Sequence, residues 1–346
     1  MSLPGRVLVT GGCGFIGSNL VRMLVRERGV AVTNLDLLTY AGNPENLADL
    51  AGDPRYRFVR GDVADGAAVA AAAEGTEAIL HLAAESHVDR SIEDPEAFLR
   101  TNVLGTRVVL DEARRRGVRA VVVSTDEVYG ALADPDEPPF TEERPLRPSS
   151  PYAASKAAAD LLALAWGRTY GADVVVTRCS NNYGPYQFPE KFLPLMIVRA
   201  MEAGELPVYG DGLYRRDWLH VTDHCRGILL ALEKGEPGRV YNFGTGADRE
   251  NLVMIRDVLR LVEEECGVRG GRVVTVPDRP GHDRRYAVDA TRARKELGWE
   301  PRVPLADGLR DTVRWYRDHR DWWERIVSGE YLVHRRTAGE EGPGED

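Results

Sequence analysis

The segment Arg6–Gly17, "RVLVTGGCGFIG", joins a short apolar strand to a glycine-rich turn and the start of a helix. Gly12, Gly14 and Gly17 fit the pattern G-x-G-x-x-G, and Gly11, Gly14 and Gly17 fit the looser G-x-x-G-x-x-G. Glycines let the backbone turn sharply and approach a pyrophosphate, whose charge then faces the N-terminus of the helix. The segment therefore predicts the first strand–turn–helix unit of a dinucleotide-binding fold.

A second apolar run, "VAVTNLD", ends at Asp36, 19 residues after Gly17. An acid at this position can accept hydrogen bonds from the ribose hydroxyls of adenosine, and it would repel a 2′-phosphate. This spacing favours NAD over NADP as the cofactor. The alternative is that Asp36 only caps the end of its strand.

Strands and helices continue to alternate along the first half of the chain. "RYRFVRGDV" predicts a third strand that ends at Asp62, and "EAILHLAAESHVDRS" predicts a fourth, whose small residues Ala83 and Ala84 let a cofactor lie close. A helix over residues 97–116 and the strand "VRAVVVSTDE" follow. Such alternation predicts an α/β fold with a Rossmann-type, doubly wound parallel sheet, whose ligands bind at the carboxyl ends of the strands.

The second half of the chain is expected to form a smaller, mainly α-helical substrate domain. We expect residues 1–180 to form the NAD-binding domain, with a further strand near 239–243 returning to its sheet. Residues 181–238 and 244–332 would then form the substrate domain. The acidic tail at 337–346 is rich in small residues, and we expect it to be disordered.

Composition argues against several classes of partner. The net charge of −9 offers no basic surface for nucleic acid or for an anionic membrane, and no apolar run approaches the ~20 residues that span a bilayer. The four cysteines are scattered, which favours free thiols in a reducing cytoplasm. His220 and His224 have the spacing of a zinc helix but lack an adjacent glutamate and a third ligand, so we expect no metal site.

Two motifs carry groups suited to proton transfer. The stretch "STDEVYG" places Asp126 and Glu127 directly after a buried strand, and in "PYAASKAAAD" Tyr152 and Lys156 are four residues apart on one helix face. The Lys156 ammonium is expected to lower the pKa of the phenol and to reach a ribose hydroxyl. A tyrosine tuned in this way can take a proton from an alcohol while hydride leaves the same carbon. The alternative is an ordinary amphipathic helix.

Neighbouring residues of an extended strand point to opposite faces. Asp126 and Glu127 can therefore reach one substrate only if the chain bends between Thr125 and Glu127, and we predict such a bend.

Longer strings carry a family resemblance that covers roughly residues 5–330. They are "HLAAESHVDRS", "STDEVYG", "PYAASKAAAD", "RCSNNYGPYQFPEKFLPL", "RRDWLHVTDH" and "DRPGHDRRYAVDA". In these strings the chain resembles the extended short-chain dehydrogenase/reductases, and within them the nucleotide-sugar 4,6-dehydratases. The resemblance implies a lyase that uses NAD and a nucleotide sugar, with dTDP-glucose as the expected substrate. An epimerase or decarboxylase of the same family, or a 4,6-dehydratase of a UDP-linked sugar, remains the alternative.

The resemblance also implies a mechanism with five catalytic residues: Thr125, Asp126, Glu127, Tyr152 and Lys156. Tyr152, helped by Lys156 and Thr125, would remove the C4 hydroxyl proton while NAD takes the C4 hydride. Glu127 would then remove the C5 proton, and Asp126 would protonate the departing C6 hydroxyl, before the hydride returns to C6. This requires Asp126 to be neutral and Glu127 to be ionised, which is reasonable because closely coupled acids share protons as a pair.

The implied ligand contacts extend over both halves of the chain. For NAD they are Gly11, Gly14, Phe15, Ile16, Gly17, Asp36, Leu38, Thr39, Asp62, Val63, Leu82, Ala83, Ala84, Ser86, Thr101, Tyr152, Lys156 and Asn182. For the nucleotide sugar they are Ser86, Thr125, Asn181, Lys191, Phe192, Pro207, Tyr209, Arg216, Asn251, Arg279, His282 and Tyr286. Within the second set, Pro207 and Tyr209 would border the base, and Arg216 would clamp the diphosphate, because the guanidinium fork suits phosphate oxygens.

The helix that carries Tyr152 and the helix before it hold more apolar residues than one sheet face needs, as in "AAADLLALAW". An exposed apolar surplus often marks an interface. Relatives in the family pair these helices across a four-helix contact, so the resemblance implies a homodimer.

Overall fold

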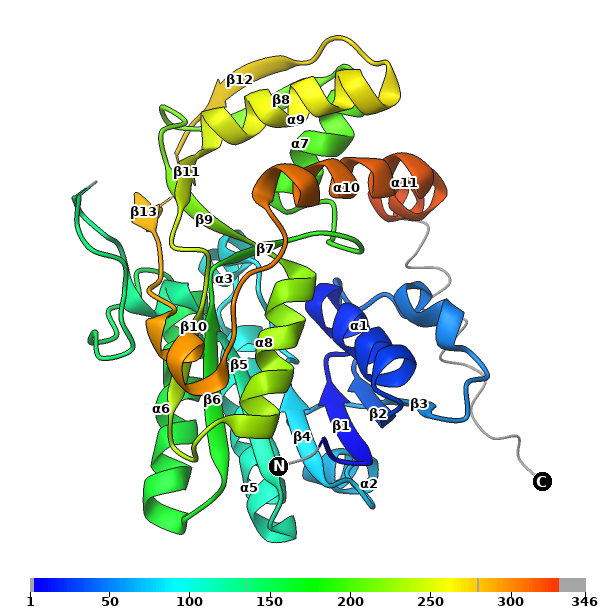
Figure 1. Ribbon diagram of the computed structural model, residues 1–346, viewed down its shortest axis with the longest axis vertical. Coiled ribbons are helices and arrows are strands. Elements are labelled where there is room, and N and C mark those ends of the chain that lie inside the picture. Colours follow the sequence, from blue (N-terminus) through cyan, green and yellow to red (C-terminus); the bar gives the residue numbers. More distant parts are fainter. Residues whose placement is uncertain (1–2, 135, 279, 330–346) are drawn as a thin grey trace.

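The computed structural model describes residues 3–134, 136–278 and 280–329, which form two parts stacked along the long axis of the molecule (Figure 1). One part is built on a large sheet covered by helices on both faces, and the other consists mainly of helices. The predicted tail at 337–346 lies outside the described residues.

The large sheet has seven parallel strands in the order β10-β6-β5-β4-β1-β2-β3. Its strands are β1 (Arg6–Thr10), β2 (Ala31–Asp36), β3 (Tyr56–Arg60), β4 (Ala78–His81), β5 (Arg119–Thr125), β6 (Val174–Cys179) and β10 (Val240–Phe243). The order reverses between β1 and β4, which is the point at which doubly wound sheets bind their ligands. The predicted Rossmann-type fold is confirmed, and β10 joins the sheet beside β6.

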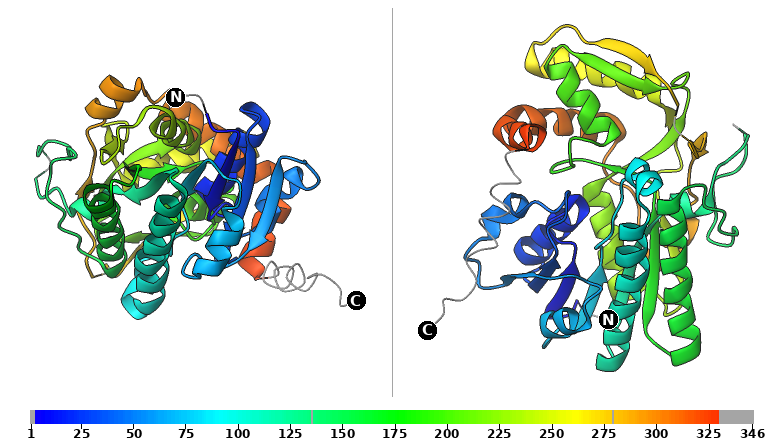
Figure 2. Two further views of the ribbon diagram at one scale, coloured as in Figure 1. Left: turned by 90° about the horizontal axis from the view of Figure 1, so that it is seen from below. Right: turned by 180° about the vertical axis from the view of Figure 1, so that it is seen from behind.

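Helices cover both faces of this sheet. One face carries α1 (Phe15–Arg22), its continuation η1 (Met23–Glu27), α8 (Val221–Lys234) and η5 (Ala293–Leu297), and the other carries α2 (Gly66–Ala72), α5 (Thr106–Arg116) and α6 (Pro151–Tyr170) (Figure 2). Successive strand residues alternate between the two cores: Val7 and Val9 pack in one, and Leu8 packs in the other. Burial on both faces explains why these strands have almost continuous apolar sequences.

The second part has its own core. It contains α7 (Phe192–Met201), α9 (Asn251–Cys266), α10 (Leu305–Asp318) and α11 (Arg320–Ser328), with the parallel strands β8 (Glu205–Tyr209) and β12 (Arg272–Val276). Trp218, Ile255, Val313 and Trp323 lie in this core. The predicted smaller, mainly α-helical part is therefore confirmed.

A small sheet lies between the two parts (Figure 1). Its central strand β9 (Arg215–His220) pairs with β7 (Asn181–Tyr183), β11 (Asp248–Glu250) and β13 (Arg285–Tyr286). The remaining short helical segments are η2 (Pro44–Leu50), α3 (Val88–Glu93), α4 (Glu96–Phe98), η3 (Leu99–Gly105) and η4 (Asp126–Tyr129).

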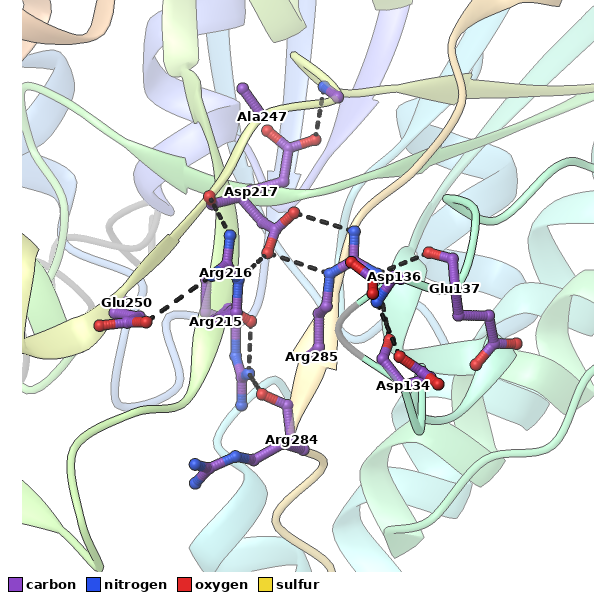
Figure 3. A network of polar contacts seen from close by, with 12 residues as sticks. Asp134, Asp136, Glu137, Arg215, Arg216, Asp217, Ala247, Glu250, Arg284 and Arg285 are labelled. Carbon is purple, nitrogen blue, oxygen red and sulfur yellow. Dashed lines mark hydrogen bonds and ion pairs between the residues drawn. The ribbon is translucent and has the colours of Figure 1, made fainter.

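Buried Arg285 fastens the loop between η4 and α6 to the small sheet (Figure 3). Its guanidinium donates to both carboxylate oxygens of Asp248, at 3.0 and 3.1 Å, and to the carbonyl of Glu137 at 2.6 Å. Arg215 donates to the same Asp248 at 2.5 Å. Because two guanidinium groups share the Asp248 carboxylate and Arg285 also binds the Glu137 carbonyl, this network ties the loop to strands of the small sheet.

The start of α6 is set by its own sequence. The Ser150 hydroxyl accepts the backbone N–H of Ala153 at 3.1 Å, Pro151 occupies the first turn, and Gly171 ends the helix with φ of 66°. These are the preferred N-cap, first-turn and C-terminal residues of helices. As a result, Tyr152 and Lys156 lie in the first two turns of α6.

Candidate active site

A cavity of about 340 Å³ opens at the carboxyl ends of the central strands of the large sheet. Most of the predicted ligand-binding residues line it. They are Gly11, Gly14, Phe15, Ile16, Gly17, Asp36, Thr39, Asp62, Val63, Leu82, Ala83, Ala84, Ser86, Thr101, Thr125, Asp126, Glu127, Tyr152, Lys156, Asn181, Asn182, Lys191 and Phe192. The fold thus brings residues from both halves of the chain to one place.

The glycine turn fits a dinucleotide pyrophosphate. A Cβ on Gly11 would lie 2.6 Å from the Ala83 nitrogen, and one on Gly17 would lie 2.1 Å from the Gly11 carbonyl oxygen, so neither position admits a side chain. Gly14 is the N-cap of α1, and no side chain caps this helix. Its first-turn N–H groups are therefore available to an anion, as a dinucleotide site requires.

Asp36 is held in a fixed orientation at the end of β2. Its Oδ2 accepts the Cys13 N–H at 2.9 Å, and its Oδ1 accepts the Leu38 N–H at 2.8 Å. The Asp36 carboxylate also lines the cavity, where an acid can accept ribose hydroxyls. Leu38 itself, predicted to contact the cofactor, does not line the cavity: with φ of 58° its side chain turns into the core, and Leu37 and Thr39 line the cavity instead.

The predicted bend at the acid pair is confirmed. Strand β5 ends at Thr125, and the 3₁₀ helix η4 begins at Asp126. The Thr125 hydroxyl caps η4 by accepting the Glu127 N–H at 3.3 Å. Because the chain turns here, Asp126 and Glu127 line the same cavity rather than opposite faces of the sheet.

Asp126 is only 2% exposed. Its Oδ1 accepts the Thr125 hydroxyl at 3.2 Å, and no described residue hydrogen-bonds its Oδ2. Burial raises the pKa of Asp126 well above its ordinary value, and the charges of Glu127 and then Asp217 raise it further. This favours the neutral acid that the family mechanism requires.

The pKa of Tyr152 differs from the expectation. Burial raises the pKa of the phenol well above its ordinary value, and Glu127 raises it further, whereas a hydrogen bond to Thr125 lowers it. The Lys156 ammonium donates to the carbonyl of Val123 at 2.8 Å. The prediction that Lys156 lowers the Tyr152 pKa is therefore wrong. Burial of the phenol and the nearby Glu127 carboxylate raise that pKa instead.

Six predicted substrate residues lie outside the cavity lining: Pro207, Tyr209, Arg216, Asn251, His282 and Tyr286. Arg279 lies outside the described residues. Most of the six gather around Tyr214. The rings of His282 and Tyr214 stack at 3.8 Å, and the Asn251 N–H donates to the Tyr214 carbonyl at 2.9 Å.

This second cluster adjoins the acid pair. The Arg216 guanidinium lies 4.4 Å from the centre of the Tyr286 ring, and its charge opposes the rise in the pKa of Asp126. Glu127 in turn raises the pKa of Tyr286, after burial. Arg216 also donates to the carbonyl of Asp283 at 2.9 Å, so in this structure its fork holds the chain before β13 as well as facing the acids.

The sequence reasoning missed several residues of the cavity. They are Leu37, Ala41, Gly42, Gly61, Glu85, Val123, Ser124, Cys179, Ser180, Gln187, Phe188, Glu190, Leu193 and Trp218. Glu85 and Glu190 are the most polar of them, and burial raises the pKa of Glu85. Both stand next to residues that were singled out, Ser86 and Lys191, so reading each motif as a continuous loop would have found them.

His220 and His224 each have an ordinary structural partner. His220 caps α8, where its ring nitrogen accepts the Thr222 N–H at 3.3 Å. His224 Nδ1 donates to Asn182 Oδ1 at 2.9 Å, and burial lowers the pKa of His224 to about 3, so the ring is neutral. His224 therefore orients Asn182, which lines the cavity. Among the described residues, no cluster of three His, Cys, Asp or Glu could hold a metal ion.

These features define the chain as a short-chain dehydrogenase/reductase with an acid pair in its candidate active site. A family model described as GDP-mannose 4,6 dehydratase matches residues 8–312. A dTDP-glucose 4,6-dehydratase of Streptomyces niveus is 53% identical over 329 residues, which cover 93% of this chain and 96% of the relative. One of Streptomyces griseus is 55% identical over 325 residues, which cover 93% of this chain and 97% of the relative.

A solved structure of a dTDP-glucose 4,6-dehydratase from Streptomyces venezuelae, with NAD bound, is 50% identical with a TM-score of 0.87. The match covers 93% of this chain and 99% of that chain. The chain belongs to the nucleotide-sugar 4,6-dehydratase family, which confirms the resemblance seen in its motifs.

Proposed function

We propose that the chain is an NAD-dependent lyase that converts dTDP-glucose to dTDP-4-keto-6-deoxyglucose and water. Its relatives at 53% and 55% identity carry the name of this activity. The observation that carries the proposal is the acid pair: Asp126 and Glu127 line one cavity with Tyr152 and Lys156, beside a turn suited to a dinucleotide.

NAD, when bound, supplies an acceptor for the C4 hydride and later returns that hydride to C6. The residues proposed to hold it are the glycine turn, Asp36 and the cavity residues predicted for the cofactor. Gly11 and Gly17 leave room for the pyrophosphate, Asp36 accepts the adenosine ribose hydroxyls, and Lys156 reaches the other ribose.

The protein residues move three protons. Tyr152 accepts the C4 hydroxyl proton as C4 is oxidised to a ketone. The ketone acidifies C5–H, so Glu127 removes that proton and later returns it to C5. Asp126 donates a proton to the C6 hydroxyl, which leaves as water. The burial of Asp126 and its raised pKa support its role as the acid in this step.

An incubation with dTDP-glucose deuterated at C4 tests the proposal. We expect loss of one water and transfer of the deuterium to C6. A C4 epimer without mass loss would indicate an epimerase instead, and loss of carbon dioxide from a sugar acid would indicate a decarboxylase. UDP-glucose deuterated at C4 serves as the matched control for the base, and faster turnover of it would assign the enzyme to UDP-linked sugars.

We infer that residues 1–180 with the strand near 239–243 bind NAD, and that 181–238 and 244–332 bind the nucleotide sugar. Lys191 and Phe192 belong to the proposed substrate-binding part. They line the same cavity as Asp126, which supports a role for that part in binding the nucleotide sugar. We also propose a cytoplasmic location, which four free cysteines favour. No helix of the described residues is long and apolar enough to cross a bilayer.

A homodimer through α5 and α6 is the proposed assembly. Leu99 and Leu104 on η3 and Leu161 on α6 are more than half exposed, at 53%, 51% and 58%. Segment η3 lies against α6, and α5 lies beside α6 on the outer surface of the large sheet (Figure 2). Exposed leucines on adjoining helices favour an interface at this face.

A further inference from the structure

Under the proposed function, each turnover ends with one extra proton on Tyr152 and one proton missing from Asp126. Tyr152 gains the proton of the C4 hydroxyl, and the product keeps a ketone there, so that proton is not returned to the sugar. Asp126 loses a proton to the departing water. Glu127 takes one proton from C5 and gives one back. A new cycle therefore needs one proton to pass from Tyr152 to Asp126.

A single hydroxyl lies between these two groups. The Thr125 hydroxyl donates to Asp126 Oδ1 at 3.2 Å, and it is hydrogen-bonded to the Tyr152 phenol. It also accepts the Glu127 N–H at 3.3 Å. A hydroxyl has one donor and two acceptor positions, so Thr125 can donate to Asp126 while it accepts from the Glu127 N–H and from the neutral phenol. The backbone bond from Glu127 fixes the oxygen in place between the phenol and the carboxyl group.

We propose that Thr125 relays a proton from Tyr152 to Asp126, so that the proton removed at C4 in one turnover becomes the proton that leaves with the C6 hydroxyl in the next. This inference rests on the proposed function and adds a step to it. In the relay, Thr125 gives its hydroxyl proton to Asp126 Oδ1 and takes the phenol proton from Tyr152 Oη. The O–H bond of Tyr152 breaks, an O–H bond forms at Asp126 Oδ1, and Thr125 exchanges one O–H bond for another, so no net charge enters or leaves the trio.

The two carboxyl oxygens of Asp126 have different neighbours. Oδ1 faces the relay through Thr125, whereas no described residue hydrogen-bonds Oδ2, which is left for the C6 hydroxyl of the substrate. One carboxyl group can thus receive a proton at the oxygen next to Thr125 and deliver it to the substrate after rotation about the Cβ–Cγ bond has exchanged the positions of the two oxygens. This arrangement needs no movement of the backbone.

The relay also explains how Tyr152 and Asp126 reach the protonation states that the next turnover needs. Moving one proton from Tyr152 to Asp126 makes the tyrosine a base and the aspartate an acid in the same event. Thr125, Asp126 and Tyr152 are all buried, so direct exchange with bulk water is restricted along this path. Burial raises the pKa of Asp126 and of Tyr152, which opposes the loss of a proton from either group to solvent.

The test compares the full-length enzyme with Thr125→Val, which keeps the side-chain shape, and Thr125→Ser, which keeps the hydroxyl. Product per active site is measured by rapid quench with dTDP-glucose in excess, at several buffer concentrations and at fixed pH and ionic strength. For wild type and Thr125→Ser we expect turnover that does not depend on buffer. For Thr125→Val we expect a partial first turnover, then a steady rate about 10²-fold slower that rises with buffer concentration, since the buffer now carries the proton.

Three results would overturn the relay. One is a Thr125→Val enzyme with wild-type steady turnover, and another is one whose first and later turnovers slow equally without buffer dependence. The third needs no variant: a wild-type rate that rises with buffer would place the proton transfer in bulk solvent. Thr125→Ala replaces Thr125→Val if the melting temperature shows that the valine variant does not fold. A wild-type enzyme that does not release water from dTDP-glucose would reject the proposed function instead.

Discussion

Arg178 Nε lies 2.8 Å from Asp160 Oδ2, and the two side chains are 3% and 0% exposed. Asp160 stands one turn after Lys156 on α6, and its charge opposes the fall in the Lys156 pKa that burial causes. Arg178 also donates to the Tyr129 hydroxyl at 2.8 Å, and that hydroxyl donates to Asn242 Oδ1 at 2.8 Å. One buried network therefore joins β6, α6, η4 and β10 one helical turn from Lys156, the proposed catalytic lysine.

Asp160→Asn is expected to lower the free energy of unfolding by about 3–5 kcal/mol, because it leaves the Arg178 charge buried without its partner. Urea unfolding at one fixed protein concentration measures the loss. Glu324→Gln, which breaks the exposed Arg320–Glu324 pair, is the matched control and should cost less than about 1 kcal/mol. Equal losses of unfolding free energy in the two variants would show that the buried Asp160–Arg178 pair stabilises the fold no more than the exposed pair does.

Glu127→Gln is expected to permit oxidation at C4 and to stop the elimination. The amide cannot take the C5 proton, so turnover should fall by about 10²- to 10⁴-fold while NADH accumulates on the enzyme. NADH absorbance in a single turnover, together with mass analysis of the product, provides the measurement. Asp126→Asn is the control, because it removes the acid and keeps the base. Full turnover by Glu127→Gln would remove Glu127 as the base.

Asp217→Asn is expected to shift the fall of activity at high pH to lower pH. Burial, Glu127 and Asp217 raise the pKa of Asp126, so removing the Asp217 charge lowers it, and the acid form is lost sooner as pH rises. The pH profile of kcat for the variant and the wild type tests this. Asp217 also accepts the N–H groups of Thr245 and Gly246, at 3.1 and 3.0 Å, so thermal unfolding must first show an intact fold. An unchanged profile would mean that Asp217 does not act on Asp126.

The fold could be predicted from the sequence because each strand and helix has a strong local sequence pattern. The apolar run before Gly11, the acid at Asp36 and the run before Thr125 each predicted a strand end, and all three ends meet at one edge of the sheet. The bend at Asp126 also followed from local reasoning, since adjacent acids on a straight strand could not share a ligand.

What the sequence could not supply was the outcome of burial and of long-range packing. The expected effect of Lys156 on the Tyr152 pKa failed because the ammonium bonds a carbonyl of β5 and because the phenol is buried beside Glu127. The position of Leu38 depended on one backbone angle. The cluster around Tyr214 forms from β8, β9, α9 and the chain before β13, a juxtaposition that no single motif encodes.

Leu161→Glu is expected to convert a dimer to a monomer at micromolar concentration, because it places a charge on the face of η3 and α6 that carries the exposed leucines. Light scattering over a dilution series measures the mass. Val327 on α11 is equally exposed, at 58%, and lies in the other part of the molecule, so Val327→Glu should leave the mass unchanged. A wild-type protein that is already monomeric would reject the proposed interface.

Asp126→Asn is expected to become increasingly more stable than the wild type as pH rises, and to abolish dehydration. The pKa of Asp126 is raised in the folded state, so between its ordinary value and its folded value the folded chain holds a proton that the unfolded chain has released. Wild-type stability therefore falls with rising pH across this window, with a slope of about 1.4 kcal/mol per pH unit for one proton. Asparagine does not titrate, so the gap in urea midpoint between variant and wild type should widen with pH until Asp126 ionises. Glu74→Gln, at an exposed position, should show no such widening. A constant gap would mean that Asp126 is ionised throughout, and an ionised Asp126 could not be the acid that expels water.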